Sequence, residues 1–201
     1  MPEEERRRHW SYRTRPDGVI SVSLDSNMWN WLYSHRSSLR LVEELPLPTF
    51  RIFIPREVEI EHLAIPEREE KQALRQFIAD TISECRIETT SYFGFAAEEG
   101  EVERHGTFGV GTFIELDEVR RLEELRHFYG TRRPSGLARD EGDVMLANLS
   151  CSSVVLSCDS KPGALTYAQE RGGKVLFVTV CNARQNALRA AVLALLDSDQ
   201  G

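Results

Sequence analysis

Two acidic residues stand where a parallel β-sheet would place a reaction site. Asp25 directly follows the apolar, β-branched run 19–24, and Asp159 follows a similar run at 154–157 after one cysteine. Both runs are typical of buried strands, and sites in open α/β sheets form at the carboxyl ends of the strands. Carboxylates that face one another repel and are costly to desolvate. A divalent cation removes that cost, and hard oxygen ligands suit Mg²⁺ or Mn²⁺.

For each of these residues the ordinary alternative is a helix N-cap. The chain carries 32 acidic residues, so some of them fall at strand ends by chance. An Asp that follows a strand also commonly caps the helix behind it. The residues that surround each acid have to distinguish a metal ligand from a cap, and here they favour a metal ligand.

Four short motifs, in chain order, resemble those of the PIN domain family. The strand that ends in L-D-S-N, with Asp25, resembles the family's opening strand, which ends in a metal-binding Asp. The run 54–63, I-P-R-E-V-E-I-E-H-L, resembles the second motif and places Glu61 on a helix. The segment D-V-M-L-A, which begins at Asp143, resembles the third motif, and S-C-D at 157–159 matches the fourth.

This resemblance implies both a fold and an activity. The fold is an α/β three-layer sandwich with a mostly parallel central sheet, and the activity is that of a Mg²⁺- or Mn²⁺-dependent endoribonuclease. The metal is expected to be held by an acidic quartet: Asp25, Glu61, Asp143 and Asp159. The third position stays open, because Asp140 and Glu141 stand close enough in sequence to replace or supplement Asp143. A bound metal activates water and neutralises phosphate charge without a histidine pair.

Polar residues beside the quartet have two interpretations each. Ser26, Asn27 and Ser157 can hydrogen-bond water on a metal, although capping and sheet contacts explain them equally well. Arg132 and Arg133 precede the third acid in a loop that either contacts RNA phosphate or is simply solvated.

The elements that must position these residues follow an alternating order. Residues 1–18 are polar and predict an N-terminal arm, and residues 19–201 predict a single domain. Strands that alternate with helices predict an α/β fold with a mostly parallel sheet. Short apolar runs predict strands at 19–24, 50–54, 154–157 and 175–178.

One stretch, at about 86–135, is an insertion relative to compact toxins of the PIN family. Over residues 86–116 apolar and polar positions alternate on either side of a polar turn, a pattern that predicts a β-hairpin. Its aromatic residues favour packing on the body, on a partner or on a second copy. The acidic turn 98–101 would repel RNA phosphate, so we do not expect this hairpin to bind substrate.

Composition limits the remaining classes. The net charge of −7 argues against a protein that covers nucleic acid with a uniformly basic surface. No apolar run approaches the ~18 residues of a membrane span, and four cysteines without C-x-x-C spacing indicate reduced thiols in the cytoplasm. No P-loop, G-x-S-x-G or dinucleotide-binding pattern is present in the sequence.

Several functional alternatives remain open. As a ribonuclease the protein would act on RNA, either in RNA processing or as the toxin of a VapBC-type pair, with an antitoxin or a second copy as partner. A PIN-like fold with a degenerate site would instead be a binding or scaffold protein. A small-molecule phosphohydrolase of the HAD type is a third class, but its D-x-D signature is missing, because the second residue after Asp25 is Asn27.

Overall fold

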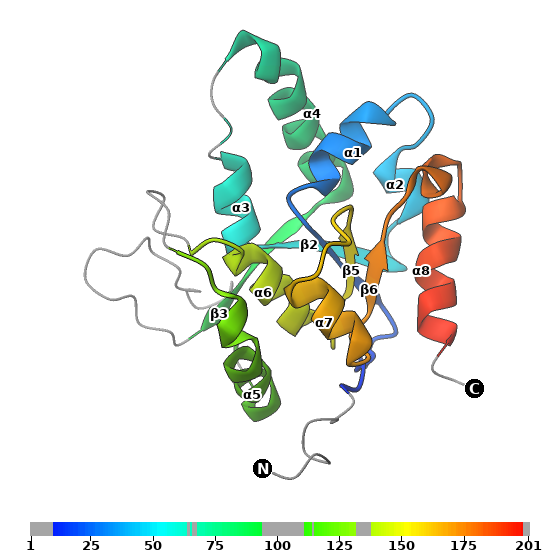
Figure 1. Ribbon diagram of the computed structural model, residues 1–201. Coiled ribbons are helices and arrows are strands. Elements are labelled where there is room, and N and C mark those ends of the chain that lie inside the picture. Colours follow the sequence, from blue (N-terminus) through cyan, green and yellow to red (C-terminus); the bar gives the residue numbers. More distant parts are fainter. Residues whose placement is uncertain are drawn as a thin grey trace.

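The computed structural model describes residues 10–63, 65, 68–93, 111–113, 115–131 and 138–198. Over these residues the chain is an α/β protein with one six-stranded sheet of order β4-β3-β2-β1-β5-β6, and every strand pairing is parallel (Figure 1). The strands are β1 (Ile20–Leu24), β2 (Phe50–Pro55), β3 (Glu88–Phe93), β4 (Gly111–Phe113), β5 (Val154–Ser157) and β6 (Val175–Phe177). The helices are α1 (Met28–Ser34), α2 (Leu41–Glu44), α3 (Arg56–Leu63), α4 (Glu69–Cys85), α5 (Leu116–Leu125), α6 (Glu141–Leu149), α7 (Ala164–Glu170) and α8 (Ala187–Asp197).

The centre of the sheet is formed by the strands that carry the sequence motifs. β1 pairs with β2 on one side and with β5 on the other, with Val22 opposite both Ile52 and Val154. Every residue of β5 is buried, as is β1 beyond its first residue. Continuous burial of this kind is expected for central parallel strands covered on both faces.

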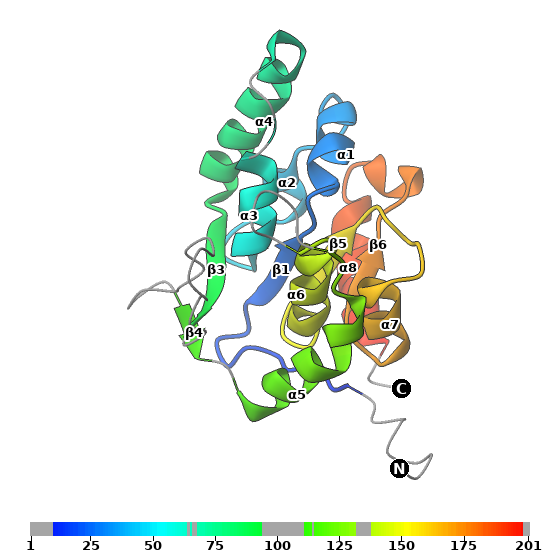
Figure 2. The ribbon, with the colours of Figure 1, turned by 60° about the vertical axis from the view of Figure 1, so that its left-hand side comes forward.

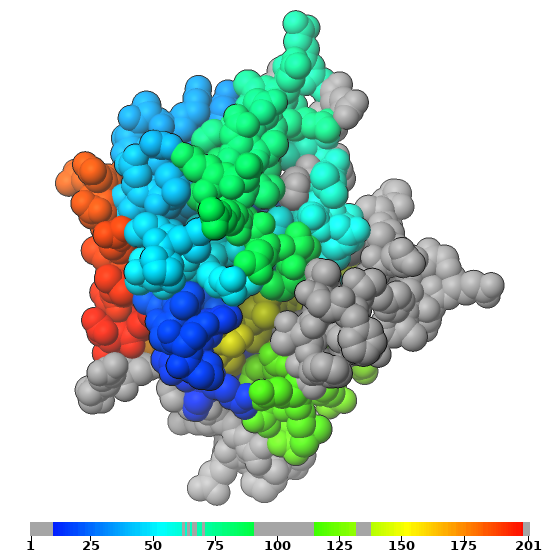
Figure 3. Space-filling view, turned by 180° about the vertical axis from the view of Figure 1, so that it is seen from behind, coloured from blue at the N-terminus to red at the C-terminus, as the bar shows by residue number. Residues whose placement is uncertain are grey.

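Two groups of helices cover the sheet. On one side α6 contacts α3, α5 and α7, and on the other α4 contacts α1 and α2, with α2 also touching α8. Figure 2 shows the first group in front of the strands, and Figure 3, from behind, shows the surface formed by the second. The three-layer α/β sandwich expected from the sequence is confirmed.

Helix α8 is held by a buried charged side chain at each end. The carboxylate of Glu44, a residue only 1% exposed, accepts hydrogen bonds from the backbone N–H groups of Asn186 and Arg189 at the helix start. At the other end Lys174, 3% exposed, donates from Nζ to the carbonyl of Leu195 at 3.0 Å. An anion at the N-terminus and a cation at the C-terminus both match the helix dipole.

The expected N-terminal arm is joined to the body from Trp10 onward. Trp10 is 6% exposed, belongs to the hydrophobic core and donates its N–H to the carbonyl of Arg171. Arg13 donates its N–H to the carbonyl of Cys151 at 2.7 Å. The polar composition of residues 1–18 did not indicate this contact, because one buried indole and two backbone hydrogen bonds hardly affect composition.

The expected β-hairpin is not what the described residues form. β3 and β4 pair in parallel, with Ser91 opposite Gly111, whereas hairpin strands are antiparallel. Alternation of apolar and polar residues predicted two strands but carries no information about their relative direction. The connection at 94–110 is long enough for a crossover between parallel strands and lies outside the described residues.

In the part of the chain that the structure describes, no helix combines the length and apolar character that a bilayer crossing requires.

Candidate metal and active site

The sheet order places three strand ends side by side. β2, β1 and β5 are neighbours and run in the same direction, so the residues that follow them meet at one edge of the sheet. Asp25 directly follows β1, and its N–H donates to the carbonyl of Leu156 on β5 at 3.0 Å. Asp159 comes two residues after β5, and Glu61 lies on α3, which begins directly after β2. Adjacent parallel strands therefore bring together acids that are far apart in sequence.

Asp25 is the most buried acid of the quartet, at 2% exposure. Its Oδ2 accepts hydrogen bonds of 2.6 Å from both Asn27 Nδ2 and Ser157 Oγ, and Ser26 Oγ donates to Oδ1 at 3.4 Å. Burial raises the pKa of Asp25, and the hydrogen bonds from Ser157, Ser26 and Asn27 oppose that rise. These donors fix the orientation of the carboxylate.

The same polar residues tie the ends of β1 and β5 together. Asn27 Oδ1 accepts the N–H of Cys158 at 2.8 Å, and Ser157 Oγ accepts the N–H of Asp159 at 3.0 Å. The backbone that leads to Asp159 is thus held by residues that also contact Asp25. Ser26, Asn27 and Ser157 all reach the Asp25 carboxylate, as a supporting role beside a metal site requires.

Glu61 and Asp143 come together where α3 packs on α6. A Cβ placed on Gly142 would lie 3.7 Å from Glu61 Oε2 and 3.5 Å from a methyl group of Val58. The Glu61 carboxylate therefore lies against the first turn of α6, beside the residue that precedes Asp143.

The charges of the other three acids of the quartet all affect the pKa of Asp143. Its pKa is raised from 3.8 to about 7, first by burial and then by the negative charges of Asp25, Asp140, Glu61 and Asp159. Each of these causes disfavours the ionised carboxyl group. Like charges from the ends of β1 and β5, from α3 and from α6 thus interact around one side chain.

Of the three candidates for the third acid, Asp143 is half-buried, and the charges of Asp25, Glu61 and Asp159 all contribute to its raised pKa. Asp140 is exposed, has a left-handed backbone with φ of 64°, and lies 3.8 Å from Arg139 Nε. Glu141 is buried, and its Oε2 accepts the N–H of Ala138 at 2.6 Å, closing the loop that enters α6.

Asp159 already has a cation beside it. Its Oδ2 lies 3.3 Å from Lys161 Nζ, and its Oδ1 accepts the N–H of Lys161 at 3.1 Å. Because the Lys161 side chain is 84% exposed, the ion pair contributes little and opens readily. Lys161 was not among the residues singled out from the sequence, although its position two residues after an acid was visible there.

The donors fit a hard divalent cation by type, since Mg²⁺ and Mn²⁺ prefer carboxylate oxygens. Among the described residues, no group of three or more His, Cys, Asp or Glu side chains lies close enough together to hold a metal ion. Binding would therefore draw the carboxylates closer, against a repulsion that the cation itself removes. Arg132 and Arg133, the expected phosphate contacts, lie outside the described residues.

Comparison with protein-family models and with curated proteins finds no match for this sequence. The candidate site consequently stands on its own geometry and on the order of its motifs.

Proposed function

We propose that the protein is a Mg²⁺- or Mn²⁺-dependent endoribonuclease that hydrolyses RNA phosphodiesters in the cytoplasm. The observation that carries the proposal is the sheet order, which brings the ends of β1 and β5 to one edge of the sheet, together with the packing of α3 on α6. The pKa of Asp143, raised first by burial and then by the charges of neighbouring acids, agrees with this arrangement. Folding brings these charges together at a cost, and a cation-binding site is the arrangement in which that cost is recovered.

In this proposal the metal is held by Asp25, Glu61, Asp143 and Asp159. A bound divalent ion would lower the pKa of a water ligand and neutralise charge that develops on phosphate oxygens. Ser157 and Asn27 orient the Asp25 carboxylate through their two 2.6 Å hydrogen bonds. The exposed Lys161 ammonium is released from Asp159 when a stronger cation binds.

RNA as the substrate is supported by the four ordered motifs that resemble those of PIN nucleases. Two biological settings are compatible with it: RNA processing, and the toxin of a VapBC-type pair neutralised by an antitoxin. A binding or scaffold protein and a small-molecule phosphohydrolase are the competing classes, and both are outcomes of the same experiment.

The test is metal-dependent cleavage of single-stranded RNA by purified protein. Wild type with Mn²⁺ should cut internally, and EDTA should stop the reaction. Asp25→Asn and Asp159→Asn should each lose nearly all activity, and the double variant should be scarcely worse, because the ligands act as a unit. Asp197→Asn, which removes an exposed carboxylate at the end of α8, is the matched control and should keep full activity.

Three results would contradict the proposal. Cleavage that persists in both ligand variants would indicate a contaminating nuclease. Metal binding without turnover of RNA would support the scaffold class. Hydrolysis of small phosphate monoesters, with RNA left intact, would support the phosphohydrolase.

A further inference from the structure

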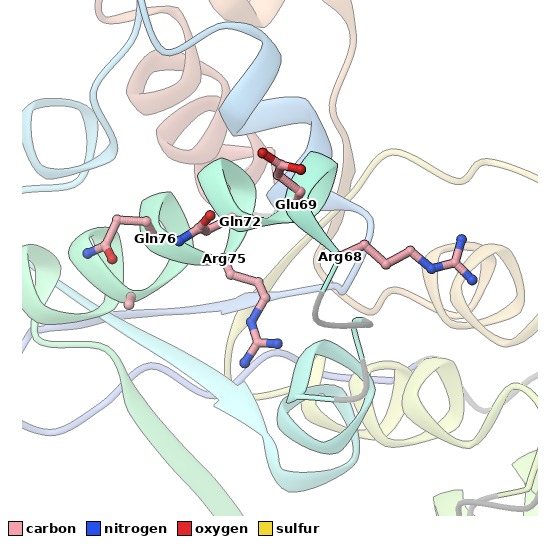
Figure 4. Close-up of a pocket in the computed structure, with 6 residues that line it drawn as sticks. Arg68, Glu69, Gln72, Arg75 and Gln76 are labelled. Atoms are coloured by element: carbon pink, nitrogen blue, oxygen red, sulfur yellow. The ribbon is translucent and has the colours of Figure 1, made fainter.

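Beside the acidic site, helix α4 presents a polar hollow of about 530 Å³. Its described lining is one stripe of the helix at spacings of three and four residues: Arg68, Glu69, Gln72, Arg75, Gln76 and Ala79 (Figure 4). The opposite stripe, with Leu74 and Ile78, is buried against the core. The hollow is therefore on the face of α4 that packing does not use.

The hollow lies on the same end of the molecule as the acids. α4 begins just after α3, and its N-terminal half extends past the carboxyl ends of the strands (Figures 1 and 2). Arg75 Nη1 donates to the carbonyl of Ile65 at 3.5 Å, which places its guanidinium beside the chain that leaves α3. Glu61 is four residues before Ile65, so the hollow adjoins the segment that carries one acid of the quartet.

The charges and their spacing select the ligand. Two guanidinium groups and the carboxamide of Gln72 are donors suited to phosphate and sugar oxygens, whereas Gln76 Nε2 already donates to Asp80 Oδ1 at 2.8 Å. Arg68 and Arg75 stand seven residues apart, about 10 Å along the helix axis, and Figure 4 shows their side chains pointing in different directions. In this arrangement the two guanidinium groups do not point at one position, which suits contacts to separate phosphates of one chain. The carboxylate of Glu69 points away from both.

We propose that this stripe of α4 binds the sugar–phosphate backbone of single-stranded RNA next to the acidic site. The proposal rests on the proposed ribonuclease function, for which it supplies the substrate-holding surface. In a protein with a net charge of −7, such a surface has to be local. RNA held along the N-terminal half of α4 would lie at the end of the molecule where the carboxyl ends of the strands meet (Figures 1 and 2).

Two substitutions of opposite charge at Gln72 should change RNA affinity in opposite directions. Gln72 is exposed and lies one turn from both arginines, so Gln72→Lys adds a phosphate contact and Gln72→Glu places an anion between the two guanidinium groups. One contact to single-stranded RNA changes affinity about fourfold at 0.15 M salt and the salt slope by about 0.7. Ala73→Lys and Ala73→Glu are the matched controls, because Ala73 is exposed on the same turn but outside the hollow.

Binding is measured by fluorescence anisotropy of a labelled 12-nucleotide oligo(U), in the cleavage-deficient Asp25→Asn background. We expect Gln72→Lys to bind about fourfold more tightly and Gln72→Glu about fourfold more weakly, with the Ala73 pair within twofold of the parent. The double variant Arg68→Gln/Arg75→Gln should lower the salt slope by about 1.4. Uridine monophosphate should compete poorly.

Several outcomes would overturn the inference: no binding of the oligonucleotide, equal effects of the Gln72 and Ala73 pairs, or equal competition by the mononucleotide. Equal competition by poly-glutamate would assign the stripe to an acidic protein partner instead. The two proposals fail separately. Cleavage that depends on Asp25 but not on the Gln72 variants would refute only the α4 surface. Opposite changes in RNA affinity for Gln72→Lys and Gln72→Glu, without any cleavage of RNA, would refute only the nuclease.

Discussion

Replacing Asp143 by asparagine should stabilise the metal-free protein at pH 8 and do so much less at pH 5. The carboxyl group has a pKa of about 7 in the folded protein, against an ordinary value of 3.8. The folded state therefore holds a proton that the unfolded chain has already released, and its stability falls as the pH rises from about 4 to 7. Above pH 7 the ionised group imposes its full penalty.

The rise of roughly three pH units corresponds to a ceiling of about 4 kcal/mol at about 1.4 kcal/mol per unit. Roughly two of those units lie between pH 5 and pH 7, so the ceiling on the change between pH 5 and pH 8 is about 3 kcal/mol. Asp143 is half-buried, and solvent screening and relaxation reduce this ceiling. We expect about half of it, which is roughly 3–6 °C in melting temperature for a chain of this length.

The assay is thermal unfolding in EDTA from pH 5 to pH 8. Wild type should lose stability across this range relative to Asp143→Asn, whereas the exposed control Asp197→Asn should follow wild type. Millimolar Mg²⁺ or Mn²⁺ at pH 8 should then stabilise wild type by about 2.7 kcal/mol if the ion is present at a hundred times its dissociation constant. Asp143→Asn should be stabilised less. A stability gain equal at pH 5 and pH 8, or a loss at pH 8, would refute the account of Asp143 as a carboxyl among like charges.

Two further substitutions test the structure around the site. Glu44→Gln should lower the free energy of unfolding, measured with urea, by about 1–3 kcal/mol, because the buried carboxylate accepts hydrogen bonds from two backbone N–H groups at the start of α8. A decrease of less than about 0.5 kcal/mol would show that α8 is held by packing alone. Ser157→Ala removes the 2.6 Å hydrogen bond to Asp25 and the acceptor of the Asp159 N–H, so it should lower metal affinity about 10–100-fold and also cost about 1–3 kcal/mol in stability. Ser157→Thr, which keeps the hydroxyl group, should retain most of that affinity, and failure of Thr to do better than Ala would contradict an orienting role.

Local sequence patterns were sufficient for the elements that carry the site. The run 154–157 forms a strand that is buried throughout, and the strand before Asp25 is buried beyond its first residue. Glu61 also lies on a helix, α3, as its motif indicated. These features depend on side-chain periodicity, which a sequence displays directly.

Features that depend on distant partners were not predictable. Glu44 meets the N–H groups of Asn186 and Arg189 more than 140 residues later, so its sequence neighbours give no sign that its charge is buried. The direction of β4 relative to β3 was wrong for a similar reason, since alternation is identical in parallel and antiparallel strands. The choice among Asp140, Glu141 and Asp143 depended on which carboxylate turns toward the other acids.

Asp25 and Asp143 have different roles because their surroundings differ. Hydrogen bonds from Ser157, Ser26 and Asn27 favour the ionised form of Asp25 and oppose the effect of its burial. Every cause that acts on Asp143 favours its neutral form, and three of the charges responsible belong to other acids of the quartet. Metal-free protein at neutral pH would therefore combine a fixed, oriented carboxylate with one whose proton is readily exchanged. A cation bound at such a site would displace the proton of Asp143 and would meet an Asp25 carboxylate whose orientation is already fixed, so the movement that brings the carboxylates closer together would fall mainly on the other acids.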